Sequence, residues 1–206
     1  MKPLTWAALA ASIALPSVVL AQGAPPNPSK DPAAVPAGAY TLEPTHTRIV
    51  WRVSHMGLSE WFGDFSTPTG TATFDPRNPS ADAVDITIST ASVTTTNATL
   101  DGELKSADWF DVAAYPTIHF KSTKVASTGP GSADVTGDLT LHGVTKPVTL
   151  KVKFYGSGLN VMDKHFTVGF QASTEIKRSD FGVTKYVPLI GDDVNIVISA
   201  PFEKAG

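Results

Sequence analysis

Hydrophobic and polar residues alternate along most of the chain from Tyr40 onward. In the segment 48–54, for example, Ile49, Trp51 and Val53 are apolar, and the alternate positions 48, 50, 52 and 54 are polar except for Val50. A period of two is typical of a β-strand with one buried face. The same period recurs in the segments 70–74, 84–88, 118–120, 135–141, 148–154, 166–172 and 194–198. The pattern therefore predicts about eight amphipathic strands.

One segment, residues 97–108, breaks this rhythm. Ala98, Leu100 and Leu104 follow helical spacing there, and charged residues lie between them. This arrangement is typical of an amphipathic helix. We therefore expect one short α-helix packed against the β structure.

Strands of this kind, separated by Asn, Asp, Gly and Pro, fit an antiparallel sandwich or a closed barrel. Of the two we predict an all-β fold that is an eight-stranded antiparallel barrel with one short helix. Such a barrel either fills its lumen with side chains or holds one small ligand, as lipocalin-type barrels do. The pattern leaves both alternatives open, although Gly137, Gly169 and Ala172 suit a tapered, partly open lumen. The positions expected to line the lumen are Ile49, Trp51, Val53, Phe74, Ile86, Phe120, Leu139, Leu150, Phe154, Phe166 and Phe170.

The first 21 residues have the composition of a secretory signal peptide. Lys2 precedes the apolar stretch Leu4–Leu20, which ends in small or apolar residues before Gln22. An uncleaved membrane anchor is the alternative, but the stretch is short, contains Pro16 and lacks a flanking basic segment. We therefore expect residues 1–21 to be removed on export.

Residues 22–37 are rich in proline and alanine and show no aliphatic periodicity. This composition predicts a disordered or loosely extended tail. The folded domain should then span residues 38–206.

The composition excludes several classes of protein. The chain has 206 residues and no cysteine, which excludes thiolate metal sites, iron–sulfur clusters and thiol nucleophiles. A formal net charge of −3 at pH 7 argues against a nucleic-acid partner. None of the five histidines forms an HxH, HxxH or HExxH pair, so no metal site is predicted. The GxSxG signature of a nucleophilic serine is absent as well, and we expect neither catalytic residues nor a cofactor.

Seven segments, in their order and spacing, resemble the YceI-like family of bacterial secreted proteins. They are 42–47 (LEPTHT), 53–59 (VSHMGLS), 63–65 (GDF), 104–111 (LKSADWFD), 115–120 (YPTIHF), 137–148 (GDLTLHGVTKPV) and 178–182 (RSDFG). The resemblance extends from Tyr40 to Phe202, although Trp109 and Pro201 depart from the family pattern. It implies a lipocalin-like barrel that encloses a long isoprenoid (polyprenyl or quinone) or another amphiphilic chain, in a periplasmic protein that is usually a homodimer.

A bound amphiphile would need polar partners for its head group at the mouth of the barrel. The candidates are His55, which shares the inward face of Trp51, and Arg178 and Asp180, which lie at a strand end beside Phe181. Each candidate also has a purely structural interpretation. His55 could be a hydrogen-bonded core histidine, and Arg178 and Asp180 could form an ion pair that holds their loop.

Two functions of different class remain. The first is a periplasmic lipid-binding protein with a carrier, storage or stress role, for which transient contact with a membrane is expected. The second is a ligandless secreted stress or structural protein whose barrel is filled. An enzyme would require a polar catalytic group inside the lumen, and we do not predict one.

Overall fold

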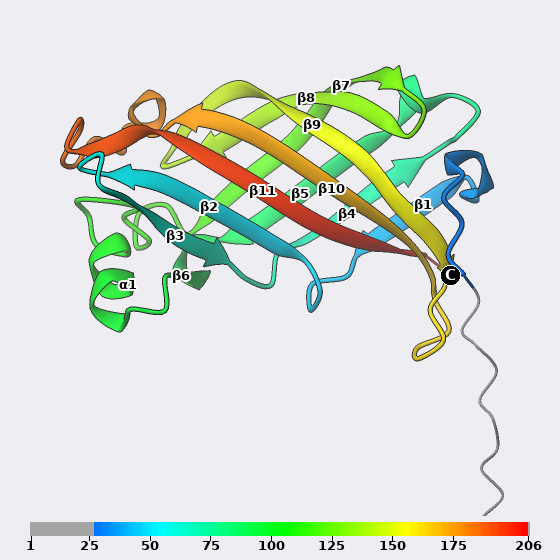
Figure 1. The fold of residues 1–206 in the computed structure, drawn as a ribbon, viewed down its shortest axis with the longest axis horizontal. Helices are drawn as coiled ribbons and strands as arrows, with labels where there is room; N and C mark the ends of the chain where they lie inside the picture. The colour runs from blue at the N-terminus through cyan, green and yellow to red at the C-terminus, as the bar shows by residue number, and fades with distance from the viewer. Residues whose placement is uncertain (1–26, 206) are drawn as a thin grey trace, which may run out of the picture.

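The computed structural model describes residues 27–205, and these form one antiparallel sheet that closes on itself (Figure 1). In the order in which they pair, the strands of the barrel are β1 (Gly38–Leu42), β4 (Thr69–Phe74), β5 (Ala83–Ser89), β7 (Thr117–Gly129), β8 (Ser132–Leu141), β9 (Val144–Leu159), β10 (Phe166–Lys177) and β11 (Ile190–Lys204). The ring is complete because β1 pairs with β4 on one side and with β11 on the other. The prediction of an eight-stranded antiparallel barrel is confirmed.

Three further strands extend the sheet at one end of the barrel. They are β2 (Arg48–His55), β3 (Ser59–Phe65) and β6 (Val93–Thr94). Strand β11 pairs with β1 near its C-terminal end and with β2 over its N-terminal part, so β2 and β3 continue the sheet where β1 stops. In Figure 1 the end with β1 and the C-terminus lies on the right, and the β2–β3 turn lies on the left with α1. We call these two ends the closed end and the mouth.

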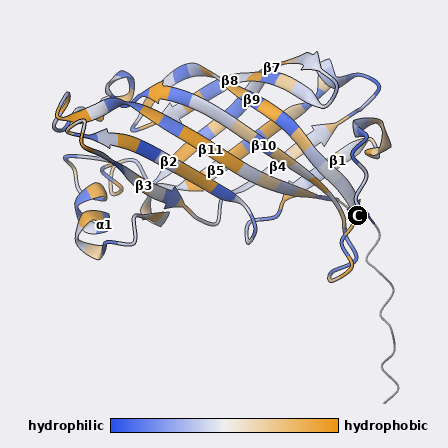
Figure 2. Ribbon diagram, in the orientation of Figure 1, coloured by the Kyte–Doolittle hydropathy of each residue, from blue (hydrophilic) through white to orange (hydrophobic). Residues whose placement is uncertain are grey.

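The strands form where the alternation predicts them, because one face of each is buried inside the barrel. In β2 the side chains of Ile49, Trp51 and Val53 are buried, whereas those of Arg48 and Arg52 are exposed. Figure 2 shows the same change from hydrophobic to hydrophilic along the other strands. Burial of one face per strand therefore builds a continuous apolar interior.

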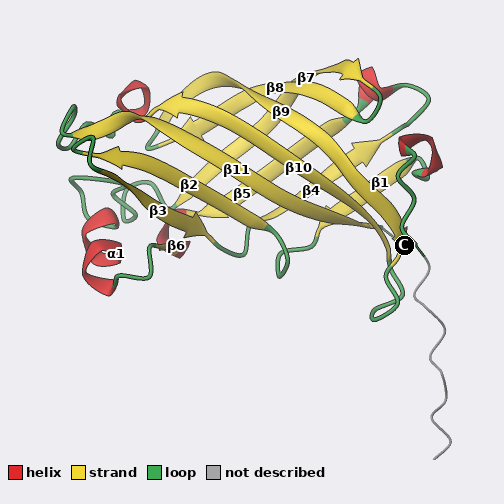
Figure 3. Cartoon of the chain, in the orientation of Figure 1, coloured by secondary structure: helices red, strands yellow, loops and turns green. Residues whose placement is uncertain are grey.

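Within residues 27–205 the structure shows one α-helix, α1 (Ala98–Leu104), and it lies within the segment where a helix was predicted. Asn97 caps it, because its side-chain oxygen accepts hydrogen bonds from the backbone N–H groups of Thr99 (3.1 Å) and Leu100 (3.2 Å). Asp101 accepts hydrogen bonds from Thr95 and so ties the helix to β6. Four short 3₁₀ helices complete the structure (Figure 3): η1 (Pro32–Ala34), η2 (Pro79–Ala81), η3 (Thr90–Ser92) and η4 (Arg178–Phe181).

The described part of the proline-rich segment, from Asn27 onward, differs from the extended tail that its composition predicts. Ser29 pairs with Ser157 of β9 through two backbone hydrogen bonds of 2.7 and 3.0 Å. Further along, η1 carries the chain to Val35, whose side chain is buried against the closed end. Residues 27–37 are therefore packed on the barrel.

The proposed signal peptide, residues 1–21, lies outside the described residues. None of the helices found from residue 27 to residue 205 is both long enough and apolar enough to cross a bilayer.

Candidate ligand-binding cavity

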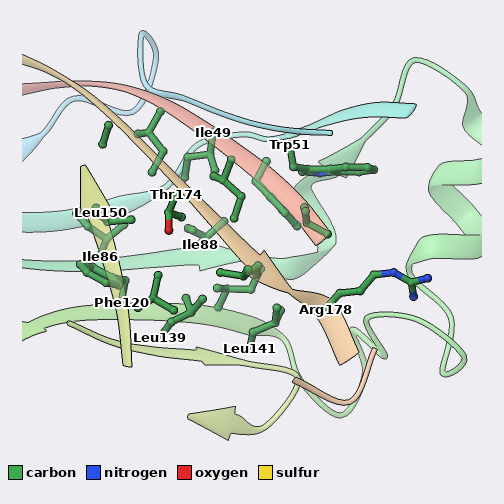
Figure 4. Close-up of a pocket in the computed structure, with 18 of the residues that line it drawn as sticks. Ile49, Trp51, Ile86, Ile88, Phe120, Leu139, Leu141, Leu150, Thr174 and Arg178 are labelled. Atoms are coloured by element: carbon green, nitrogen blue, oxygen red, sulfur yellow. The ribbon is translucent and has the colours of Figure 1, made fainter. Parts of the chain in front are cut away.

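The interior of the barrel is hollow. A cavity of about 610 Å³ extends from the mouth toward the closed end, and apolar side chains from the strands cover most of its wall (Figure 4). This volume is in the range of sites that hold a small molecule. Of the two alternatives that the sequence left open, a filled and a hollow lumen, the structure has the hollow one.

Most of the residues expected in the lumen lie on the cavity wall. Nine of the eleven line it: Ile49, Trp51, Val53, Phe74, Ile86, Phe120, Leu139, Leu150 and Phe170. Contrary to the prediction, Phe154 and Phe166 are not among the residues that form the wall. Both pack instead in the apolar cluster of the closed end.

Aromatic rings form this floor. The ring centroid of Phe74 lies 5.0 Å from that of Tyr40, 5.1 Å from that of Phe170 and 5.7 Å from that of Phe202. Phe154 is paired with Phe170 across β9 and β10 and lies beside it, with 6.0 Å between their ring centroids. Tilted and edge-on contacts of this kind are favourable for aromatic pairs, and they seal the closed end of the barrel.

Other wall residues were not among the predicted ones. Ile88, Leu141 and Ile196 follow the same inward alternation as their predicted neighbours, so the sequence pattern contained the signal for them. The α1 residues Leu100, Glu103 and Leu104 line the mouth, together with Trp109, Tyr186 and Leu189 from loops. No local pattern marks these loop residues, because only the folded chain brings the loops to the barrel.

Trp51 forms part of the wall near the mouth and depends on the strand beside it. Its indole ring lies directly over Gly63 of β3, where a Cβ atom would come within 2.5 Å of Trp51 Cε2. The Trp51 Nε1–H is buried and has no hydrogen-bond partner among the described residues. A buried donor without a partner is unfavourable by about 1–3 kcal/mol, so packing of the ring must outweigh this cost.

Arg178 is a buried cation at the mouth. Its guanidinium donates hydrogen bonds to the backbone oxygens of Val183 (2.9 Å), Ile190 (2.9 Å) and Gly191 (2.8 Å), and it lies 5.4 Å from the ring centre of Trp109. Burial lowers the pKa of Arg178 below its ordinary value, yet arginine stays protonated in proteins. These bonds use three of the five N–H donors, so two have no partner among the described residues.

The counter-charge of Arg178 is incomplete. None of the ion pairs among the described residues includes Arg178. Asp192 is the carboxylate that most affects it, but Asp192 accepts hydrogen bonds from the Ser179 backbone N–H (2.8 Å) and hydroxyl (2.7 Å). Burial acts to raise the pKa of Asp192, but these hydrogen bonds and nearby cations outweigh it and lower the pKa. Arg178 therefore presents positive charge to the mouth of the cavity.

His55, at the end of β2, also lines the cavity. Its ring stands edge-on to Trp61, with 6.2 Å between the ring centroids, and its side chain forms no hydrogen bond with the described residues. The interpretation of His55 as a hydrogen-bonded core histidine is therefore wrong for this structure. Its imidazole nitrogens can bond to a guest.

Contrary to the prediction, Asp180 and Phe181 do not lie at the mouth of the cavity. Asp180 lies outside the barrel, where its carboxylate pairs with Lys146 Nζ at 3.0 Å rather than with Arg178. Phe181 is buried in the core beneath η4 and does not reach the cavity. Of the four predicted mouth residues, the structure brings only His55 and Arg178 to the cavity.

Asp82 is a polar wall residue that the sequence reasoning missed. It accepts a hydrogen bond of 2.7 Å from the backbone N–H of Asp75, next to Phe74 of the floor. Burial raises the pKa of Asp82 to about 6. The cavity thus has a cation at the mouth and a weakly acidic carboxyl group near the closed end.

One group of potential metal ligands lies elsewhere on the described surface. It consists of Asp163, His165 and Glu203, with 3.1 Å between His165 Nδ1 and Glu203 Oε2. This group is at the closed end, outside the cavity.

The cavity itself offers a long apolar volume with hydrogen-bond donors at the mouth, which suits an amphiphilic guest.

Comparison with known proteins places this geometry in a family. A family model described as a YceI-like domain matches residues 40–202. A UPF0312 protein of Ectopseudomonas mendocina is 41% identical over 154 residues, which cover 75% of this chain and 80% of that protein.

Two solved structures share the fold. The crystal structure of BcnA from Burkholderia cenocepacia superposes with a TM-score of 0.71 and 26% identity, covering 78% of this chain and 98% of that one. A domain from Saccharophagus degradans, described as polyisoprenoid-binding and implicated in plant cell wall breakdown, has a TM-score of 0.63 and 16% identity, covering 82% of this chain and 99% of that one. At that identity the second structure supports the fold alone.

Proposed function

Because the chain belongs to the YceI-like family, we propose that it is a lipid-binding protein that encloses the chain of an isoprenoid, or of a similar amphiphile, in its barrel. The observation that carries this proposal is the apolar cavity of about 610 Å³ with a buried cation at its mouth. The description of the Saccharophagus degradans domain as polyisoprenoid-binding agrees with it.

The wall can supply the binding free energy without directional contacts. Transfer of an apolar chain from water to such a cavity is favourable by about 0.8 kcal/mol per methylene group. A few isoprene units therefore suffice for tight binding, since every additional 1.4 kcal/mol or so of binding free energy, about two methylene groups, lowers the dissociation constant roughly tenfold. The aromatic floor at Phe74 and Phe170 would limit how deeply the chain can enter.

The head group would lie at the mouth beside Arg178 and His55. Arg178 has two N–H donors without a partner among the described residues, and a guanidinium donates hydrogen bonds to electron-rich acceptors such as oxygen. A polyprenyl phosphate and a quinone both offer such oxygens, and a charged phosphate would gain more from the buried guanidinium. We propose that Arg178 and His55 bind this oxygen-rich end.

The arrangement fits binding better than catalysis. The polar groups of the wall are spread along the cavity, from Asp82 near the floor to Arg178 and His55 at the mouth. A catalytic site would require such groups to converge on one reacting atom. A carrier, storage or stress role needs only that the chain be held and released.

The cellular setting is part of the same proposal. The pattern of residues 1–21 supports export to the periplasm, and the family resemblance supports a homodimer. Size-exclusion chromatography with light scattering tests the dimer. Mass determination of protein purified from a periplasmic extract tests cleavage before Gln22.

Mass spectrometry of organic extracts from purified protein, combined with a displacement assay, tests the proposal. The expected extract contains a prenyl chain in stoichiometric amount, and the protein binds N-phenyl-1-naphthylamine, which polyprenyl phosphate displaces. Extracts without lipid together with no fluorophore binding would overturn the proposal in favour of the ligandless barrel.

Cavity filling locates the site in the same assay. Ala172 lines the cavity, whereas its neighbour Ser173 is exposed on the outer face of β10. Ala172→Phe should weaken fluorophore binding about tenfold or more, or about 1.4 kcal/mol. Ser173→Phe, the matched control, should bind as the wild type does. Equal affinity of both variants would place the fluorophore outside the barrel.

A further inference from the structure

Two loops at the mouth hold large apolar side chains in solvent. Met56 and Leu58 lie on the turn between β2 and β3, and Tyr186 and Leu189 lie on the loop before β11. The exposed fractions of Leu58 and Leu189 are 86% and 64%. Exposed apolar side chains that gather in one place mark a surface that contacts something other than water. We call these four residues the mouth rim.

The mouth rim is held in its outward position. The backbone N–H of Met56 donates a hydrogen bond of 2.8 Å to the backbone oxygen of Leu189, which joins the two loops. The second loop is closed by a hydrogen bond of 2.9 Å from the Ile190 N–H to the Tyr186 oxygen. In Figure 2 the loops at the left tip of the barrel are hydrophobic. These apolar side chains are therefore presented outward by an ordered backbone.

The mouth rim is also continuous with the cavity. Met56, Tyr186 and Leu189 line the cavity as well as being exposed to solvent. An apolar chain leaving the lumen would therefore pass from one apolar surface to the next at this end. The mouth rim is therefore the surface across which a water-insoluble chain would enter or leave the barrel.

We infer that the mouth rim docks on the surface of a phospholipid bilayer, where an amphiphile passes directly between the membrane and the barrel. This inference rests on the proposed function. A bilayer is favoured as the partner because the mouth rim is continuous with the cavity, from which a water-insoluble chain must leave, and because tyrosine, here Tyr186, favours the membrane–water interface. Residues 55–59 and 184–190 contain no carboxylate, and Lys185 pairs with Asp108 at 2.6 Å, so the two loops carry no excess of negative charge.

A second exposed apolar loop lies at the closed end, and it lacks the mouth rim's continuity with the cavity. Val161 and Met162 on the β9–β10 loop are also exposed, and Figure 1 places this loop at the opposite end of the barrel. However, this loop does not reach the cavity, so no apolar path leads from it to the lumen. The loop therefore serves as a matched control.

Vesicle co-sedimentation of the full-length mature protein tests the inference. The vesicles contain phosphatidylethanolamine and phosphatidylglycerol, and the variants are Leu58→Ser at the mouth and Met162→Ser at the closed end, whose side chains are 86% and 87% exposed and do not line the cavity. We expect the mouth variant to lose about tenfold in vesicle binding, because an inserted leucine side chain loses its apolar burial. The control should remain within about twofold of wild type, since its loop stays in water. Both variants should bind N-phenyl-1-naphthylamine in solution as the wild type does.

Three results would overturn the inference. The first is vesicle binding by the mouth variant at wild-type strength. The second is an equal loss of vesicle binding in both variants, and the third is a wild-type protein that does not bind vesicles. If light scattering then shows a dimer that the mouth variant loses, the mouth rim binds a second copy of this chain instead. Failure of the wild-type protein to bind the fluorophore in solution would refute the proposed function separately, whatever the vesicles show.

Discussion

Gly63 determines where the indole of Trp51 can lie. The ring covers the Gly63 backbone across the β2–β3 pair, so a side chain at position 63 would occupy the same space as the ring. We expect Gly63→Ala to reduce the free energy of unfolding by about 1–3 kcal/mol, because the ring must leave its position in a packed wall. Urea denaturation followed by tryptophan fluorescence measures this change.

Gly102 provides the control for this substitution. It lies within α1, and a Cβ atom added there would have nothing within 4 Å. Gly102→Ala should leave stability unchanged or raise it by up to about 1 kcal/mol, because alanine favours the helix. If both variants lost the same stability, the close approach of Trp51 and Gly63 would not be the cause.

Asp82 should give the protein a stability that falls with rising pH in one interval. Burial raises its pKa from 3.8 to about 6, so the folded chain holds this proton more tightly than the unfolded chain does. The stabilising effect is complete below the unfolded pKa and is lost as the pH rises through 6. Asp82→Asn should therefore flatten the decline in unfolding free energy between pH 4 and pH 6, as measured by urea denaturation at each pH.

Asp85 gives the contrasting case. A hydrogen bond from His119 lowers the pKa of its carboxyl group, so its contribution is present above the unfolded value of 3.8 and is lost as the pH falls further. Asp85→Asn should change the curve below that value and leave the interval up to pH 6 as in the wild type. A wild-type slope that survives in Asp82→Asn would assign the decline to another group.

Strand β10 shows how far the period of two can be followed from the sequence. Its inward positions are Phe166, Val168, Phe170, Ala172, Thr174 and Ile176, and the next position of the same parity is Arg178. In the structure, alternate residues of β10 continue to face inward up to Arg178, which lines the cavity. Asp180 is expected at the mouth from its place at the strand end beside Phe181, but the chain turns into η4 at Arg178 and the alternation ends there. The start of a short 3₁₀ helix has no strong sequence signal, so this prediction fails.

Position along the strand is the second limit. Phe154 and Phe166 are predicted inward by the same alternation, but they pack in the apolar cluster of the closed end and do not line the cavity. A β-bulge between Gly169 and Phe170 shifts the pairing of β9 with β10 at this level. The period identifies the face of a strand, whereas the depth of a residue in the barrel depends on pairing that only the folded sheet fixes.

At the scale of the whole molecule, the mouth and the closed end are built from different kinds of sequence. The mouth combines β2 with α1 and the segment 178–190, which are far apart in the chain, and its loops show no periodicity. The closed end combines strand residues with the proline-rich segment at 27–37. The fold class could be predicted because strands share one simple period. The mouth could be predicted only where it continues a strand, at His55 and Arg178.

The segment before β1 should contribute measurably to global stability, although it precedes the residues that match the family model. Val35 is 7% exposed and packs in the apolar cluster of the closed end, whereas Val197 on β11 is 57% exposed. Val35→Ala should lower the free energy of unfolding by about 1–3 kcal/mol, because it removes buried methyl groups and leaves a cavity. Val197→Ala, the same change on the surface, should cost less than about 0.5 kcal/mol. Both values come from urea denaturation, and equal effects would mean that residues 27–37 do not pack on the barrel in solution. Fluorophore affinity should stay at the wild-type value in both variants, because neither Val35 nor Val197 lines the cavity.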